Sequence, residues 1–481
     1  MSGLKSELTL FDVTNLVVGS IIGADIYVAS AFGAGFLGPF SLVVWVAAGI
    51  IAIIIALCFA QCAALLPKVG GPYAYAHEAW GPFAGFTVGW SLWLAEWMSL
   101  AVFPVAFTQY IMFFLPGLDA SLQIVVKAAF VLFLIVTNIA GVKAAGRTND
   151  VLTIVKLAPL VFFALAGIAY IVLNTATSAS NFSPFLPLGL GSFGPALVLI
   201  FWAYAGFEIS TIPAEEIRNP AKTIPKAILI GITIVTVFYL VTNFVLFAVR
   251  PWTSLAQDTA PLATATNNIL APTPLLALAG ALIVGVGALI SVAGSDESGM
   301  IGTSRLGYAL AADGLFPKAF AKIHPKYKTP YLGIIIQAVT ALAASIIGNN
   351  LGTLIATSVF FMAVAYTATS ISIVTLRKKH PNPQFHLPGG LIIPALGAVF
   401  SVYLITQCTP LQIGLGILLL AIGIPVYIKY TPKKEIAQLK QTLLTQETRL
   451  KTAYDQEHLF LAHALRHIRK LYRKAKQKNQ E

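Results

Sequence analysis

The chain has 481 residues, of which 57% are hydrophobic and only 10% are charged, and its formal net charge is +12. This composition excludes an ordinary soluble globular protein and predicts an all-α polytopic membrane protein. All seven histidines lie in loops or in the tail, and the three cysteines Cys58, Cys62 and Cys408 fall in apolar stretches. Neither a disulfide framework nor a metal site is therefore expected, and we predict no cofactor, no catalytic residue and no enzymatic activity.

Twelve apolar stretches are long enough to cross about 30 Å of hydrocarbon as helices. The first begins about ten residues from Met1 and is expected to remain as span one. The twelve stretches begin near residues 11, 40, 82, 122, 149, 192, 225, 275, 331, 352, 389 and 410.

The distribution of basic residues predicts the orientation. If Met1 is cytoplasmic, all but three of the 31 Lys and Arg residues fall in cytoplasmic segments or at their membrane edges. The exceptions are Lys127, Lys156 and Arg250. This asymmetry predicts a plasma-membrane protein with both termini in the cytoplasm. The net charge therefore reflects topology and not nucleic-acid binding.

A lone aspartate lies inside the first span. Asp25 follows Gly23 and Ala24, and the glycines on this stretch loosen the helix that a membrane span otherwise requires. Because ionisable residues at this depth are costly and usually face a ligand, a cavity or a partner, we interpret this position as a site on a transport pathway.

Three motifs rich in Gly, Pro and aromatic residues occur at or after the second, sixth and eighth spans. They read PKVGGPYAY at 67–75, FWAYAGFE at 201–208 and SRLGYALAADGLFP at 304–317. Together with the glycine-broken first span, they resemble the amino acid–polyamine–organocation superfamily of transporters, in its order and spacing, over about residues 10–330.

The resemblance implies two five-helix inverted repeats, at about 11–173 and 192–375, with two extra helices at about 389–430. Residues 1–430 would then form the transporter domain and 431–481 a basic cytoplasmic helical tail. The first helix of each repeat would be broken, and Gly23-Ala24 and Ala205-Gly206 occupy these equivalent places.

The resemblance also implies that a substrate binds at the two breaks. Backbone N–H groups of Gly23 and Ala24 would bind a carboxylate, carbonyls around Trp202 and Ala203 would receive an amine, and Trp202 would be an aromatic gate. The alternative for Trp202, an interface anchor, fits poorly with its mid-span position. The predicted substrate-binding residues are Ile22, Gly23, Ala24, Asp25, Glu96, Trp202, Ala203, Gly206, Glu208 and Glu297.

Lys156 lies in the fifth span and resembles a lysine that replaces a sodium ion in many members of this superfamily. Its ammonium group would hold spans one, five and eight together, and loss of its proton would couple transport to the proton gradient. A snorkelling lysine is the structural alternative. If Asp296 or Glu297 pairs with Lys156, the coupling proton would pass to a carboxylate instead.

Asp25 stands where most relatives have glycine or serine. Five intramembrane carboxylates face one intramembrane lysine, which favours a cationic substrate, either a polyamine or a basic amino acid. Asp25 could instead be protonated or turned from the site, and Glu96 could simply bond a neighbouring helix. The five carboxylates are Asp25, Glu96, Glu208, Asp296 and Glu297.

The tail after Tyr430 is basic and amphipathic. Anionic lipids are its first predicted partner, a partner helix its second, and a solvated tail the third reading. The oligomeric state stays open; in a homodimer, the extra helices and the tail are the natural places for subunit contacts. We predict a proton-coupled secondary transporter of amino acids or related amines. The alternatives are a neutral amino-acid permease of the same fold and a transporter-like sensor.

Overall fold

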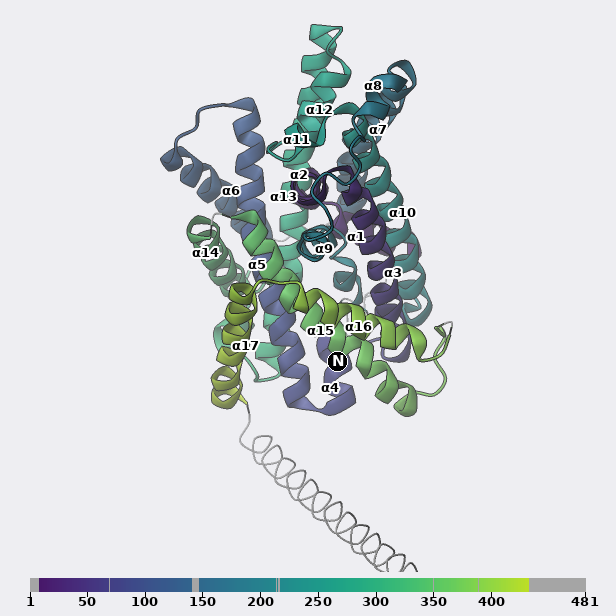
Figure 1. Cartoon of the computed structure of the whole chain (residues 1–481). Coiled ribbons are helices and arrows are strands. Elements are labelled where there is room, and N and C mark those ends of the chain that lie inside the picture. Colours follow the sequence, from purple (N-terminus) through teal and green to yellow (C-terminus); the bar gives the residue numbers. More distant parts are fainter. Residues whose placement is uncertain are drawn as a thin grey trace, which may run out of the picture. The chain divides into compact units, whose positions relative to one another are not determined.

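The computed structural model describes residues 8–68, 70–140, 147–212, 214, 217–348, 350–387 and 389–431. The chain divides into a first unit, Met1–Tyr427, and a second unit, Ile428–Glu481. Within the described residues every regular element is helical, apart from one isolated bridge that joins Leu8 and Ile217 (Figure 1). The predicted all-α class is therefore confirmed.

Eight helical segments of the described chain are long and apolar enough to cross a membrane. One of them, Ala24–Leu65, combines α2 (Ala24–Leu37), the 3-10 turn η1 (Gly38–Phe40) and α3 (Ser41–Leu65). The others are α5 (Pro82–Phe114), α6 (Ala120–Ala140), Val155–Leu173 of α7 (Arg147–Leu173), α10 (Pro220–Val249), α13 (Pro274–Ala312), α15 (Leu351–Lys379) and α17 (Pro410–Tyr430).

Four shorter apolar helices complete the pattern. They are α1 (Leu10–Ile21), α9 (Phe193–Trp202), α14 (Tyr331–Ile347) and α16 (Ile392–Thr406). The connections carry α4 (Pro72–Trp80), α8 (Thr175–Ser180), η2 (Phe207–Thr211), α11 (Trp252–Leu255), α12 (Pro261–Ile269) and η4 (Lys318–Ala321).

Each predicted apolar stretch coincides with one of these helices, and the first coincides with α1 and α2 together. The start of the seventh stretch differs most, since the sequence predicts it near residue 225 and α10 begins at Pro220. Proline is favoured at a first helical position because its missing N–H would have no partner there. The helices fit a multi-pass membrane protein, and the count of twelve spans stays a prediction.

The first and sixth predicted spans are interrupted, as the sequence indicated. Between α1 and α2, Ile22 is extended and Gly23 leaves the helical region, with φ −143° and ψ −133°. Between α9 and η2, the chain turns through residues 203–206, and Gly206 has a φ of +119°. Both breaks therefore leave backbone N–H and C=O groups without their helical partners.

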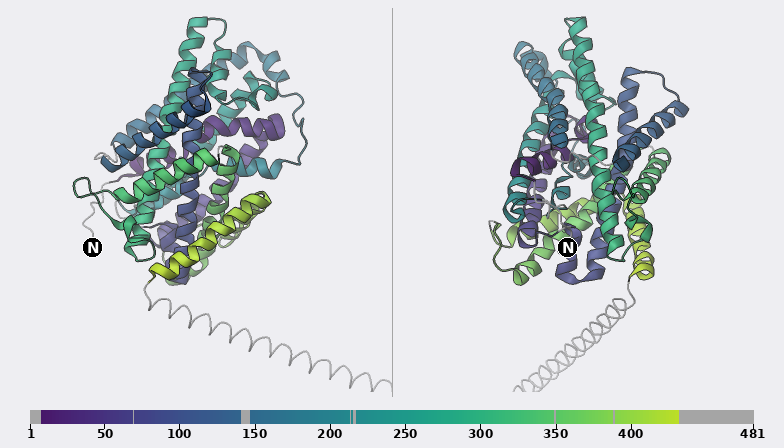
Figure 2. Two further views of the ribbon diagram at one scale, coloured as in Figure 1. Left: turned by 90° about the vertical axis from the view of Figure 1, so that its left-hand side faces the viewer. Right: turned by 180° about the vertical axis from the view of Figure 1, so that it is seen from behind.

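Helix packing brings the two breaks together. Helix α2 packs against α9, and α1 packs against η2. Helices α10 and α7 lie against α1, while α13 contacts α1, α5 and α7 (Figures 1 and 2). The breaks are thus enclosed by α5, α7, α10 and α13, which supply the side chains described below.

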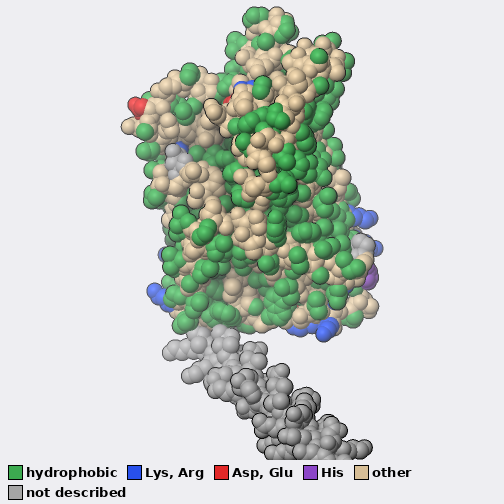
Figure 3. Space-filling model, viewed as in Figure 1, with side chains coloured by type: hydrophobic (Ala, Val, Ile, Leu, Met, Phe, Trp, Pro, Cys, Tyr) green, Lys and Arg blue, Asp and Glu red, His purple; other side chains and the backbone are tan. Residues whose placement is uncertain are grey.

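Basic side chains lie mainly toward one end of the first unit, and hydrophobic side chains are spread over the face above it (Figure 3). At this end, Glu78 on α4 lies 3.8 Å from the side-chain nitrogens of Lys68, Lys379 and His380. The last turn of α15 adds Arg377 and Lys378. This clustering is consistent with the predicted cytoplasmic face, while the orientation of the termini stays a prediction.

Candidate functional site

The two helix breaks touch one another through their backbones. A Cβ atom on Gly206 would lie 2.8 Å from the carbonyl oxygen of Ser20 in α1. The Ser20 hydroxyl donates a hydrogen bond of 2.9 Å to the carbonyl oxygen of Gly206. Glycine alone combines this positive φ with so close an approach of two backbones. Gly206 therefore fixes the contact between the break after α9 and the end of α1.

Asp25 lies in the first turn of α2, directly beyond the first break. Its Oδ2 accepts a 2.7 Å hydrogen bond from the hydroxyl of Tyr239 on α10, and its Oδ1 lies 2.9 Å from the position of a Cβ built on Gly23. The residue is only 4% exposed. The Tyr239 hydroxyl also lies 3.2 Å from the carbonyl oxygen of Ile21. The predicted site residues Ile22 to Asp25 are thus brought together, all of them buried.

Lys156 connects three elements at the first break. Its Nζ donates to the carbonyl oxygen of Gly19 at 3.1 Å and to Oγ of Ser295 on α13 at 3.3 Å. The Ser295 hydroxyl in turn lies 2.9 Å from the carbonyl oxygen of Ile22. Lys156 therefore links α7 to α1 and α13, which are the fifth, first and eighth predicted spans. Its role in coupling stays a prediction.

Neither Asp296 nor Glu297 forms the direct ion pair with Lys156 that the sequence left open. Among the described residues, no ion pair within 4 Å joins Lys156 to either acid. Glu297 acts on Lys156 electrostatically, as Asp25 does, whereas Asp296 is buried and its Oδ1 has no hydrogen-bond partner in the described structure. The two acids point about 100° apart on a regular helix, so α13 does not present both of them to one ligand.

Two carboxyl groups meet at the second break. Glu208 on η2 is fully buried, and its Oε2 accepts a 2.9 Å hydrogen bond from the backbone N–H of Gly206. The carboxyl group of Glu96 on α5 and the hydroxyl of Tyr366 on α15 are near enough to act on it electrostatically, although the Tyr366 hydroxyl has no hydrogen-bond partner in the described structure. Oε1 of Glu208 has no geometrically well-formed hydrogen bond from the described residues. This arrangement can hold a proton between two acids.

Trp202 closes α9 at the same break and lies against α5. Its indole N–H donates a 3.0 Å hydrogen bond to Oγ of Ser99, which lies 2.9 Å from Oγ of Ser358 on α15. Its ring packs at 6.0 Å from that of Phe103. The residue is 5% exposed, and Ala203 beside it is fully buried. Trp202 thus bridges three elements at the predicted gate position, although its gating role is untested.

Sequence reasoning missed several of these partners. Tyr239, Ser295 and Tyr366 lie within apolar helices, where a single hydroxyl residue gives no local pattern that would mark it. Lys127 is noted from the sequence only as an exception to the distribution of basic residues. In the structure it is buried on α6, and its Nζ donates a 3.0 Å hydrogen bond to the carbonyl oxygen of Ser345. Its position more than one turn into a predicted span was the available signal.

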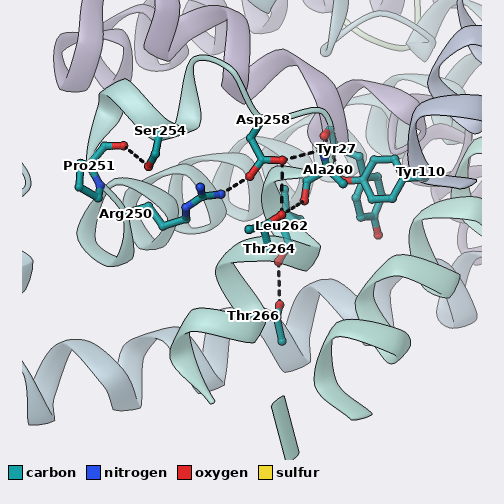
Figure 4. A network of polar contacts seen from close by, with 10 residues as sticks. All are labelled: Tyr27, Tyr110, Arg250, Pro251, Ser254, Asp258, Ala260, Leu262, Thr264 and Thr266. Atoms are coloured by element: carbon teal, nitrogen blue, oxygen red, sulfur yellow. Dashed lines mark hydrogen bonds and ion pairs between the residues drawn. The ribbon is translucent and has the colours of Figure 1, made fainter. Parts of the chain in front are cut away.

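A second polar network ties the connection between α10 and α13 together (Figure 4). Arg250, which ends α10, pairs with Asp258, and both side chains are 11% exposed. Oδ1 of Asp258 accepts a 2.8 Å hydrogen bond from the backbone N–H of Ala260, which precedes α12. Nearby, the hydroxyl of Tyr110 donates a 3.1 Å hydrogen bond to the carbonyl oxygen of Tyr27. Because α11 and α12 pack on α2, this network supports the helix that carries Asp25.

We expect Asp258→Asn to lower the thermal stability of the purified protein. Loss of one partner of a mostly buried ion pair costs about 3–5 kcal/mol, because the other charge remains uncompensated. The double variant Arg250→Met with Asp258→Asn should recover most of this loss, since asparagine can still accept the Ala260 N–H. Thermal unfolding in detergent measures both. Equal destabilisation of the single and double variants would assign the effect to packing instead.

The described residues contain no group of three or more His, Cys, Asp or Glu side chains that could hold a metal ion. The site therefore consists of two apposed helix breaks, a buried lysine and several buried carboxyl groups inside a membrane helix bundle. In secondary transporters, broken helices of this kind form the binding site of a small polar substrate.

Comparison with known proteins agrees with the class of membrane transporters. The family model described as "Amino acid permease" matches residues 8–422, and the chain belongs to this family of membrane transporters. The chain is 29% identical to the branched-chain amino acid permease BcaP of Bacillus subtilis, over 89% of this chain and 94% of that protein. It is 29% identical to the methylthioribose transporter of the same organism, with 90% and 95% coverage. Human b(0,+)-type amino acid transporter 1 is 28% identical, with 84% and 82% coverage.

Proposed function

We propose that the protein is a proton-coupled secondary transporter of the plasma membrane, with both termini in the cytoplasm. Its substrate is a small organic cation, a polyamine or a basic amino acid, which binds between the two helix breaks. The observation that carries this proposal is the charge of the site: Asp25, Glu96 and Glu208 are buried around the breaks, with Lys156 as the basic residue there. An acidic, desolvated pathway favours a cation over an anion.

In this proposal, the breaks in α1–α2 and α9–η2 let the two halves of each span move separately. The backbone around Gly23 and Ala24 binds one end of the substrate, and the carbonyls around Trp202 and Ala203 receive an ammonium group. The Trp202 ring then covers the site as its gate. Glu297, which is partly exposed on α13, adds negative charge along the pathway.

Proton coupling is assigned to the facing pair Glu96 and Glu208. Two carboxylates that are close together and away from water repel one another strongly, so such a pair is most stable with one shared proton. Glu208 accepts the Gly206 N–H through Oε2, and a protonated Glu96 supplies a donor for Oε1. Lys156 holds the first break to α13 and is the alternative carrier of the coupling proton.

A second candidate function is supported by the relatives. Their names describe carriers of branched-chain amino acids, of serine and threonine, and of large neutral amino acids. A neutral amino-acid permease would use the same site with Asp25 protonated or held by Tyr239.

The predicted lipid contacts and signalling role of the tail concern residues 432–481, which lie outside the described residues, and a homodimer stays a prediction.

The test uses proteoliposomes that contain a pH-sensitive dye. Wild-type protein should move protons when putrescine, lysine or arginine is added, and alanine or leucine should compete weakly. Glu96→Gln should retain exchange of labelled substrate and lose the coupled proton flux, because glutamine can still donate to Glu208. Glu78→Gln, on the partly exposed α4, is the matched control and should behave as wild type. Proton flux that persists in Glu96→Gln, or competition by neutral amino acids alone, would contradict the proposal.

A further inference from the structure

The amino end of α2 is already occupied by a carboxylate that belongs to the protein. The free N–H groups and the dipole at the start of a helix form a site for anions. Here the Asp25 carboxylate lies at this end of the helix: Oδ1 is 2.9 Å from the position of a Cβ built on Gly23, and Oδ2 accepts the Tyr239 hydroxyl at 2.7 Å. A substrate carboxylate would have to share these donors with Asp25.

Gly23 makes room for this arrangement. A Cβ atom on residue 23 would lie 2.9 Å from Oδ1 of Asp25 and 2.6 Å from Oγ of Ser295. Any larger residue would therefore push the carboxylate away from the helix end. The position of the Asp25 carboxylate therefore requires glycine at residue 23.

The phenol of Tyr239 is held rigidly from the opposite side. Its ring packs edge-on against Trp45 at 5.4 Å and against Tyr204 at 5.3 Å. The Tyr204 hydroxyl donates a 2.9 Å hydrogen bond to the carbonyl oxygen of Trp45, which fixes these two rings relative to one another. Tyr239 is fully buried, so its hydroxyl has little freedom to leave Asp25.

Lys156 leaves the Asp25 carboxylate without a direct ion pair. Its ammonium group is bonded to Gly19 and Ser295, and no ion pair within 4 Å of Asp25 occurs among the described residues. Among the described residues, no cation is thus paired directly with the Asp25 carboxylate, and a second cation near the break can bind it.

We propose that Asp25 takes the place of the substrate's carboxylate, so that the site prefers amines without an α-carboxylate over the amino acids with the same side chain. Tyr239 is the positioning residue that holds Asp25 there. Two carboxylates about 4 Å apart at an effective dielectric of 20 repel by a free energy equal to roughly a thousandfold in affinity. The inference rests on the proposed function, because it requires that the breaks bind the substrate.

The test compares matched pairs that differ only in the carboxylate, such as cadaverine with lysine and isopentylamine with leucine. Competition against labelled substrate in proteoliposomes gives an affinity ratio for each pair. In wild type, the amine should bind at least about tenfold more tightly than its amino acid. Asp25→Gly should reverse this ratio, since it frees the amides of α2. Tyr239→Phe should reduce the ratio, a change that a loss of folded protein alone does not produce.

Asp119→Gly is the matched control, because Asp119 precedes α6 on the exposed surface and glycine is tolerated at a helix N-cap. Thermal stability shows that each variant is folded. If lysine binds wild type as tightly as cadaverine, and Asp25→Gly leaves the amine to amino acid affinity ratio unchanged, the inference about Asp25 is wrong and the proposed function is retained. If no member of any pair binds, both are overturned. If Asp25→Gly does not fold, Asp25→Asn replaces it, and an unchanged ratio in that variant also contradicts the role of the charge.

Discussion

Gly206→Ala is expected to abolish transport and to lower the yield of folded protein. The backbone at this position has a φ of +119°, where a non-glycine residue is strained by about 1–3 kcal/mol. The added methyl group would also lie 2.8 Å from the Ser20 carbonyl oxygen, and such overpacking costs about 1–3 kcal/mol more. Because the clash falls on the backbone of the other break, relief requires that the two breaks separate.

The effect is measured by uptake in proteoliposomes and by thermal unfolding of the purified variant. Gly414→Ala is the matched control, since a Cβ atom there has no neighbour within 4 Å. In the interior of α17 this change should leave transport unchanged and stabilise the helix by about 0.5–1 kcal/mol. Wild-type uptake by Gly206→Ala would show that the two breaks do not need this close contact.

Lys156→Met is expected to reduce proton-driven transport by roughly 100-fold, which corresponds to about 3 kcal/mol. Methionine is similar in length but cannot donate to the Gly19 carbonyl oxygen or to Ser295. Hydrogen bonds from a charged group are worth about 1.5–3 kcal/mol each, and these two join α7 to α1 and α13. Without them, the first break loses its attachment to α13.

Lys156→Arg should fail as well, although it keeps the charge. The Lys156 Cε lies 2.6 Å from where a Cβ on Gly294 would be, so the space is fitted to a slender side chain and a guanidinium group is too wide. Lys127→Met is the control for removal of a buried lysine from an apolar helix. It should lower thermal stability while transport by the folded fraction persists. The reverse outcome, with transport lost in Lys127→Met and retained in Lys156→Met, would move the functional role to α6.

The comparison of substrates in the Asp25 variants connects these predictions to specificity. Gly206 and Lys156 hold the two breaks in place, and their loss should affect every substrate alike. Asp25 and Tyr239 act at the end of α2, and their replacement should change which substrate binds. Parallel measurement of total uptake and of the amine to amino acid ratio therefore separates the framework of the site from its selectivity.

The helices, their apolar character and the two breaks could be predicted from local runs of residues. A bilayer requires long apolar segments whose backbone hydrogen bonds are made within the segment. Each span is therefore recognisable as a continuous run of apolar residues, and the glycines of the breaks interrupt that run. For the same reason Asp25, Glu96, Lys156 and Glu208 were recognisable as charged residues at depth. The family was accessible as well, because its motifs are contiguous in the chain.

The contacts between side chains of different helices could not be predicted in this way and are known from the folded structure. Asp25 and Tyr239 are 214 residues apart in the chain, and Lys156 and Ser295 are 139 apart. Their contact depends on how α10 and α13 are rotated about their axes, which apolar helices with polar residues on more than one side do not specify locally. The sequence left open whether Asp296 or Glu297 binds Lys156, whereas in the structure the hydrogen-bond partner on α13 is Ser295. Partner choice is set by the geometry of all neighbouring helices at once, and this is why it emerged only from the folded chain.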